Sequence, residues 1–169
     1  YQEVFTDPSY FGQIIIMTND HIGNYGALDT EVESRSIAIS GLICKKFSAH
    51  NYSRLSATES LQAYFEKNNL VGISDVDTRA LTIHVRENGA MNCIISSEIS
   101  DIEILKRKLA ETPDMSGLDL AKEVSTKEAY FTGNETAPYK VAVLDCGVKQ
   151  SILNCLTDAG VYAKVFNAS

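Results

Sequence analysis

One short segment, residues 145–149 (Asp-Cys-Gly-Val-Lys), carries residue types that can do chemistry. A helix that starts after such a turn attracts anions to its amino terminus, and a cysteine there can act as a nucleophile. The segment lacks the G-x-G-x-x-G and P-loop patterns of nucleotide-binding turns. No base for Cys146 is visible in the sequence around it. The residues alone therefore favour an ordinary tight turn.

Ser9 is a second candidate, because it follows Asp7-Pro8 at what reads as the start of a short helix. Aspartate caps helices and proline suits their first position. A hydroxyl exposed there could position a polar substrate. Without further information, Ser9 is interpreted as an ordinary first-turn residue.

Two pairs of carboxylates are spaced two residues apart, a spacing that places both on one side of a strand or loop. They are Glu31 with Glu33 and Asp75 with Asp77. A solvated loop explains the first pair and a helix cap the second.

The cysteines and histidines show no metal-ligand spacing and no C-x-x-C pair. We expect each cysteine to be a small buried apolar side chain and assign no metal site. Free thiols without a secretion signal favour a reducing compartment, so we expect a cytoplasmic protein. The residues concerned are Cys44, Cys93, Cys146, Cys155, His21, His50 and His84.

Composition excludes two classes of function. The chain has 169 residues, 44% of them hydrophobic and 22% charged, with a formal charge of -7. The longest aliphatic run, residues 14–17, is far shorter than the roughly 20 apolar residues of a membrane span. The one basic cluster, residues 106–108, would point in different directions on a helix. We therefore expect neither a membrane nor a nucleic-acid partner.

The elements that must position these residues alternate between strands and helices along the first part of the chain. A capping box at residues 56–59 predicts a helix that buries Leu61, Tyr64 and Phe65. Two further helices are expected after Asp77, with Ala80, Leu81, His84 and Val85 inward, and after Asp101, with Ile102, Leu105 and Leu109 inward. Strands are expected over residues 13–18, 36–44, 70–76 and 90–96.

Residues 132–138 concentrate turn formers and predict a domain boundary. After it, residues 141–144 form an apolar strand of the kind buried on both faces of a parallel sheet. A helix with Ile152, Leu153 and Leu156 inward and a strand over 161–166 complete one right-handed β-α-β unit. So small a unit cannot cover such a strand. We therefore expect a fragment, with the second domain continuing beyond Ser169.

Five segments, in this order and at similar spacing, resemble the small, glutaminase subunit of carbamoyl-phosphate synthase along the whole chain. They are residues 1–10 (YQEVFTDPSY), 21–26 (HIGNYG), 72–82 (GISDVDTRALT), 89–96 (GAMNCIIS) and 143–149 (VLDCGVK). Two positions depart from the family pattern: Asn19-Asp20 replaces Tyr-Pro, and Cys146 replaces Phe.

The resemblance implies an α/β chain with a swivelling β/β/α domain over residues 1–131, its first strands missing. Residues 139–169 would begin a truncated class I glutamine amidotransferase domain. In this family the small subunit hydrolyses L-glutamine with a Cys-His-Glu arrangement. The ammonia passes through a tunnel to a large, ATP-using subunit, and carbamoyl phosphate feeds arginine and pyrimidine synthesis.

The resemblance also implies which residues act. The nucleophile would lie past Ser169, so no catalytic residue and no cofactor are expected in this chain. The fragment alone would be inactive, and ATP and Mg would bind the large subunit. Ser9 matches the serine that helps to hold glutamine from the first domain. The alternative is a non-catalytic protein-interaction module derived from the family, with an acidic surface.

Overall fold

The computed structural model describes residues 1–168, and these group by their contacts into two compact units. Unit 1 comprises residues 1–2, 12–31 and 39–116. Unit 2 comprises residues 3–11, 32–38 and those from 117 onward. Unit 2 thus takes two segments from the beginning of the chain. The assignment of domains to residues 1–131 and 139–169 stays a prediction.

Unit 1 contains a small parallel sheet of three strands in the order β1-β2-β3. The strands are β1 (Ile14–Ile16), β2 (Gly41–Ile43) and β3 (Gly72–Ile73). Each lies inside a segment predicted as strand, although the paired region is shorter. Aliphatic residues at these positions suit a pleated, buried surface, and Leu42 is fully buried.

The first long helix of unit 1 is α2 (Leu61–Lys67). Its buried residues are Leu61, Tyr64 and Phe65, which confirms the predicted face. The predicted capping box at residues 56–59 is wrong, because the Ser60 side chain accepts the hydrogen bond from the Ala63 N–H. Among neighbouring residues, the one directly before the first helical turn is placed to accept its free N–H groups, and here that residue is Ser60.

The next helices are α3 (Thr78–Asn88), capped by Asp77, and α4 (Ile102–Glu111), capped by Asp101. These starting points confirm the prediction. The inward faces were partly wrong: Ala80, His84 and Ile102 are exposed, and the other expected core residues are half-buried. Among the described residues, neither helix packs extensively on another helix or strand.

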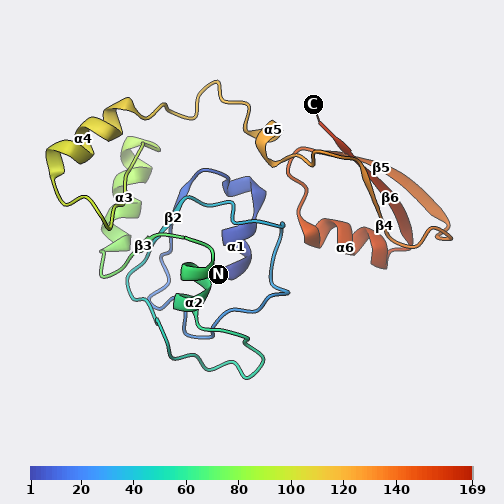
Figure 1. Cartoon of the computed structure of the whole chain (residues 1–169), viewed down its shortest axis with the longest axis horizontal. Helices are drawn as coiled ribbons and strands as arrows, with labels where there is room; N and C mark the ends of the chain where they lie inside the picture. The colour runs from blue at the N-terminus through green and yellow to red at the C-terminus, as the bar shows by residue number, and fades with distance from the viewer. Residues whose placement is uncertain (169) are drawn as a thin grey trace. The chain divides into compact units, whose positions relative to one another are not determined.

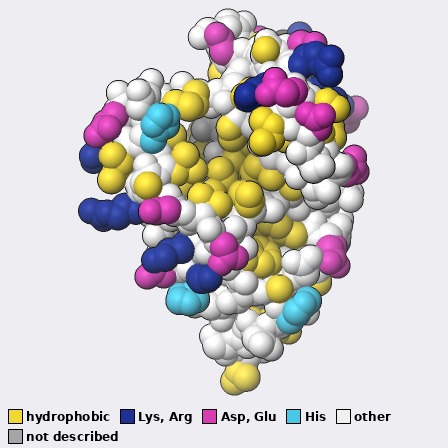
Figure 2. Space-filling model, turned by 90° about the vertical axis from the view of Figure 1, so that its left-hand side faces the viewer, with side chains coloured by type: hydrophobic (Ala, Val, Ile, Leu, Met, Phe, Trp, Pro, Cys, Tyr) yellow, Lys and Arg dark blue, Asp and Glu magenta, His cyan; other side chains and the backbone are white. Residues whose placement is uncertain are grey.

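Residues 90–96, predicted as a strand, pair with no strand in the described part of the chain. The prediction was wrong because an apolar segment becomes a strand only when it hydrogen-bonds to another strand, and the sequence does not show whether it does. Met91 and Ile94 remain exposed. Figure 2 looks from the side of α3 and α4 and shows hydrophobic side chains gathered around a hollow in the centre of that face.

Unit 2 is built around a sheet in the order β4-β6-β5, with β6 parallel to β5 and antiparallel to β4 (Figure 1). The predicted segment of strand, helix and parallel strand is therefore present. The predicted turn-forming segment, residues 132–138, begins at the last residue of β4 and leads into β5, so it joins two strands of this one sheet. The elements are α1 (Gln2–Thr6, with Gln2 in unit 1), η1 (Pro8–Tyr10, a 3-10 helix), α5 (Leu120–Val124), β4 (Tyr130–Thr132), β5 (Tyr139–Asp145), α6 (Gln150–Asp158) and β6 (Val161–Asn167).

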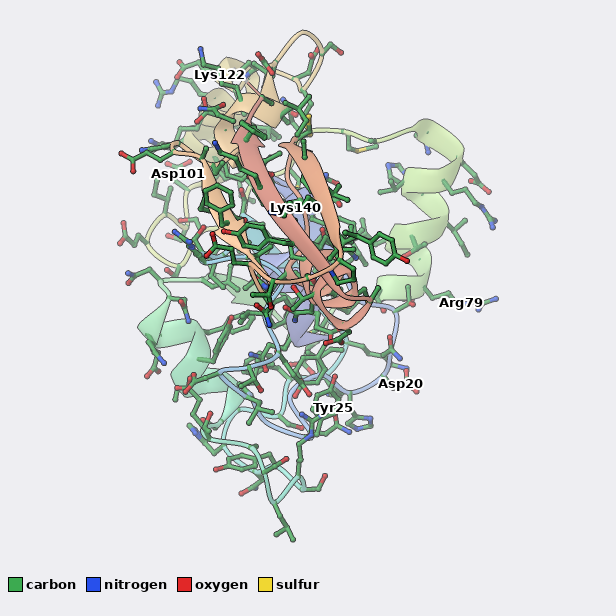
Figure 3. All side chains as sticks on the ribbon, turned by 90° about the vertical axis from the view of Figure 1, so that its right-hand side faces the viewer. Asp20, Tyr25, Arg79, Asp101, Lys122 and Lys140 are labelled. Carbon is green, nitrogen blue, oxygen red and sulfur yellow. The ribbon has the colours of Figure 1, made fainter. Side chains whose placement is uncertain are left out.

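One face of this sheet is covered and the other is open. Helix α6 lies along one face (Figure 1), where Leu153 and alternate residues of β6 are buried. On the other face, Phe131 stacks on Tyr162 with ring centroids 5.2 Å apart. Leu144 of β5 is 65% exposed, so residues 141–144 are not covered on both faces in the described chain, as expected for so small a unit. The side chains of these strands are drawn in Figure 3, where Lys140 of β5 is labelled.

Candidate functional site

The candidate site lies in unit 2, where η1 meets the turn between β5 and α6. Ser9 is exposed on η1, as a residue that touches a ligand must be. Asp7 caps this turn: its Oδ1 accepts the Ser9 N–H at 2.9 Å, and its carbonyl accepts the Tyr10 N–H at 3.0 Å. Pro8 at the first position fixes φ near the helical value. Asp7 and Pro8 together therefore hold the backbone around Ser9.

The β5–α6 turn is held by Asp145, which is 5% exposed. Its Oδ1 accepts the N–H groups of Gly147 and Val148 at 2.9 and 2.8 Å. Its Oδ2 accepts the Thr126 N–H at 2.7 Å. A buried carboxylate is costly unless it is hydrogen-bonded, and three backbone donors meet that need here. Asp145 thus fixes the backbone of the turn.

Gly147 lets this turn approach η1 closely. Its φ is +97°, a conformation that other residues rarely adopt. A Cβ at this position would lie 2.8 Å from Val124 Cγ2 and 3.1 Å from Pro8 Cβ. The close contact with the residue before Ser9 therefore requires glycine.

An ion pair links the two sides of the site: the Lys149 ammonium lies 3.4 Å from Asp7 Oδ2. Burial tends to raise the pKa of Asp7, but the hydrogen bond from Ser9 and the charge of Lys149 outweigh it and lower that pKa. The charge of Asp7, its hydrogen bond and, more weakly, Glu33 raise the pKa of Lys149. Both groups are therefore charged at neutral pH.

Glu33 attaches a third segment to the same place. Its Oε2 accepts the Ser151 N–H at 2.9 Å, and its carbonyl accepts the Gln150 N–H at 2.8 Å. Its own N–H donates to Thr6 Oγ1 at 2.8 Å. The side chain is 8% exposed, so the interpretation of Glu33 as a solvated loop residue was wrong.

The arrangement is suited to holding a polar ligand rather than to breaking a bond. Ser9 presents a hydroxyl from a turn fixed by Asp7 and Lys149, and such a fixed group loses little entropy when it binds. Within residues 1–168, no group of three or more His, Cys, Asp or Glu side chains is placed to hold a metal ion. Cys146 is exposed at the neighbouring turn.

Sequence reasoning named Ser9, Glu33 and the segment that contains Lys149 as separate candidates, but it did not bring them together, because they lie far apart in the chain. No local pattern marks a hydrogen bond between residues 118 positions apart, as for Glu33 and Ser151. The expectation of buried cysteines was right for Cys44 and wrong for the other three, which are exposed. Burial raises the pKa of the Cys44 thiol, which makes it less reactive.

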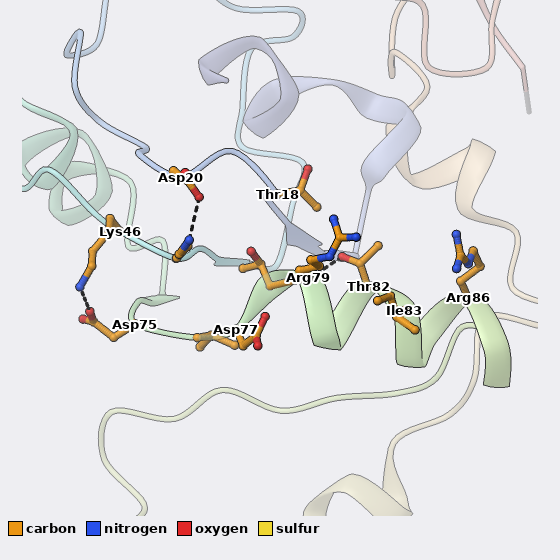
Figure 4. A pocket seen from close by; sticks show the side chains of 12 residues that line it. Thr18, Asp20, Lys46, Asp75, Asp77, Arg79, Thr82, Ile83 and Arg86 are labelled. Carbon is orange, nitrogen blue, oxygen red and sulfur yellow. Dashed lines mark hydrogen bonds and ion pairs between the residues drawn. The ribbon is translucent and has the colours of Figure 1, made fainter.

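A cavity of about 790 Å³ in unit 1 is the other candidate (Figure 4). It lies beside α3, and Arg79, Thr82 and Arg86 line it from that helix. Two ion pairs occupy its margin, Lys45 with Asp20 and Lys46 with Asp75. All four of these side chains are more than half exposed. The two ion pairs neutralise four of its charges, and its lining contains no serine, cysteine or histidine.

In the part of the chain that the structure describes, no helix is both long and apolar enough to span a membrane. Comparison with known proteins gives a more specific result. The family model described as "Carbamoyl-phosphate synthase small chain, CPSase domain" matches residues 1–95, more than half of the chain.

Curated relatives extend the similarity beyond residue 95. The chain is 40% identical over 168 residues to the carbamoyl phosphate synthase small chain of Chlorobaculum tepidum, covering 99% of this chain and 46% of that protein. It is 42% identical to the Aquifex aeolicus small chain and 39% identical to that of Escherichia coli K12, covering 95% of this chain and 46% of each protein. The chain therefore spans about half the length of the curated relatives it matches. On these matches, the chain belongs to the carbamoyl-phosphate synthase small-chain family.

Proposed function

We propose that this chain is part of the glutamine-hydrolysing small chain of a carbamoyl-phosphate synthase. The observation that carries the proposal is the match of residues 1–95 to the family model, supported by 40% identity across 99% of the chain to one small chain. The parent protein would release ammonia from L-glutamine in the cytoplasm. A large chain that binds ATP and Mg would use this ammonia to make carbamoyl phosphate for arginine and pyrimidine synthesis.

Within this function, Ser9 contributes a hydrogen bond to glutamine. Its exposure and the capping of its turn by Asp7 support this role. A hydroxyl can accept from the α-ammonium or amide of glutamine and donate to its oxygen atoms. The Lys149–Asp7 pair keeps the turn in place beside α6.

The bond-breaking step requires a thiolate activated by an imidazole and donors that stabilise the tetrahedral intermediate. The turn around Cys146 offers no such set. Asp145 accepts backbone N–H groups of this turn, and Gly147 allows its close approach to Pro8, so both residues have structural roles there. The finer domain assignment, a swivelling domain followed by the start of a class I amidotransferase domain, belongs to the same proposal. Residues 1–169 alone would therefore hydrolyse no glutamine.

The test is an assay of the full-length gene product for ammonia release from glutamine, with and without a large chain. We expect activity that rises when the large chain is present. Ser9→Ala should raise the glutamine KM about tenfold, the equivalent of one hydrogen bond, with little change in kcat. Ser36→Ala, an exposed serine of the same unit, is the matched control. Ammonia release in neither setting would contradict the proposal.

That negative result would leave the non-catalytic interaction module. The comparisons do not favour it, because the relatives named above are all synthase small chains. Steady ammonia release from purified residues 1–169 would contradict the expectation that this chain lacks the catalytic residues.

A further inference from the structure

We propose that Glu33 is a positioning residue for Ser9, acting through the first turn of α6. The proposal rests on the glutamine-binding role of Ser9 given above. Glu33 belongs to the segment 32–38, which neither carries Ser9 nor precedes α6 in the sequence. Its influence on glutamine would therefore be indirect, through the atoms it holds in place.

Glu33 uses its backbone and its side chain for different partners. The N–H donates to Thr6 Oγ1, at the end of α1, while the carbonyl and the carboxylate accept the N–H groups of Gln150 and Ser151. These three hydrogen bonds are 2.8 to 2.9 Å long. One residue thus joins the segment leading into η1 to the first turn of α6.

Helix α6 needs this outside contact because its own cap residue does not cap it. The first N–H groups of a helix have no partner within the helix, and a Ser, Thr, Asp or Asn at the cap position normally accepts one. The cap position of α6 holds Lys149, whose side chain makes no such bond. The carboxylate of Glu33 takes over the task, and its negative charge suits a helix amino terminus.

This division of roles connects Glu33 to Ser9. Because Glu33 supplies the acceptor, the cap position can hold a lysine, which has no acceptor of its own; the Lys149 side chain extends to Asp7 Oδ2, and Asp7 Oδ1 accepts the Ser9 N–H. Loss of the cap would loosen residues 149–151. The Lys149–Asp7 pair would then hold Ser9 less firmly, and glutamine would have to order the turn on binding.

The experiment is a double-mutant cycle in the full-length gene product, with the glutamine KM as readout. Glu33→Gln keeps the size of the side chain and one acceptor oxygen but removes the charge. We expect it to raise KM about three- to tenfold when Ser9 is present and less than about twofold in the Ser9→Ala background, since residues that act through one another are not additive. Glu31→Gln, a carboxylate of the same loop that pairs with Arg54, is the control and should leave KM unchanged.

Hydrogen exchange provides a readout that does not depend on glutamine hydrolysis. Glu33→Gln should speed exchange in peptides covering residues 148–154 and also in those covering residues 6–11. Glu33→Asp keeps the charge and should show smaller changes in both; it also serves if Glu33→Gln does not fold.

Faster exchange confined to α6, or KM effects of Glu33→Gln and Ser9→Ala that simply multiply, would overturn the proposal. If the wild-type protein hydrolyses no glutamine, the proposed function fails, and the exchange at residues 6–11 still decides whether Glu33 positions Ser9.

Discussion

The β5–α6 turn of unit 2 and the cavity beside α3 in unit 1 both contain several carboxylates, but the carboxylates have different partners. At the turn, Asp7, Glu33 and Asp145 are less than 9% exposed and accept backbone N–H groups. At the cavity, Asp20 and Asp75 are exposed and pair with lysine ammonium groups. A backbone N–H has a fixed direction, whereas a lysine side chain adapts. The buried set therefore defines a geometry, and the exposed set contributes little beyond solubility.

The largest effect should come from Asp145→Ala. The substitution leaves three partly buried backbone N–H groups without their acceptor. We expect the free energy of unfolding of the full-length protein to fall by about 3 kcal/mol or more, measured by urea denaturation. Asp145→Asn, which keeps one acceptor oxygen, should cost less. A loss below about 1 kcal/mol for the alanine variant would show that the buried set does not fix the turn.

Gly147→Ala should have the next largest effect, because it combines positive φ with a steric overlap. A Cβ would lie 2.8 Å from Val124, whereas a Cβ at Gly117, with φ of +79°, would meet nothing within 4 Å. We expect a loss of about 2–3 kcal/mol at Gly147 and about 1 kcal/mol at Gly117, from thermal unfolding. Equal losses would mean that the contact with Pro8 and Val124 is not close.

Asp7 should give a smaller effect that depends on pH. Its folded pKa lies below the ordinary value of 3.8, so its ionised form stabilises the protein above that value, and this contribution is lost as the pH falls through the folded pKa. Asp7→Asn keeps a capping oxygen but loses the charge that pairs with Lys149, so it should be less stable than wild type at neutral pH by up to about 1 kcal/mol.

The difference between Asp7→Asn and wild type should shrink as the pH is lowered below about 3.8 in urea titrations. On the alkaline side, the raised pKa of Lys149 means that its contribution is complete below 10.5 and is lost as the pH rises through the folded value. A difference that does not vary with pH would show that folding does not lower the pKa of Asp7.

The smallest effect is expected for Lys46→Ala at the α3 cavity. The ammonium is exposed and its partner Asp75 is 67% exposed, so solvent and salt screen the pair. The urea midpoint should not change measurably. A clear decrease in the midpoint would show that the exposed ion pairs at the cavity also stabilise the fold, which would contradict the comparison of the two regions.

The sequence predicted those elements that depend on neighbouring residues. The starts of α3 and α4 follow from Asp77 and Asp101, each of which caps the helix that begins directly after it. The strand over residues 90–96 was predicted wrongly, because strand formation depends on a partner elsewhere in the chain. The same distinction explains why the predicted inward face of α3 was partly wrong. Periodicity shows which residues share one side of a helix, but not whether another part of the protein packs against that side.

The candidate site shows the same limit. Ser9 was found through a resemblance, and its cap by Asp7 through a local pattern. The contributions of Glu33 and Lys149 were not predictable, since each depends on a contact between residues more than 100 positions apart. The need for glycine at position 147 was likewise not predictable, because it arises from close contacts with Pro8 and Val124 in the folded chain.

The pairing of Asp7 with Lys149 also has a consequence during synthesis on the ribosome. The two residues are 142 positions apart, so the segment that carries Ser9 emerges long before its partner. At ordinary translation rates this interval is roughly 7 to 30 seconds. The contact of Thr6 with Glu33 can form early, whereas Asp7 gains its partner Lys149 only after most of the chain has been made, so the turn that carries Ser9 is completed late.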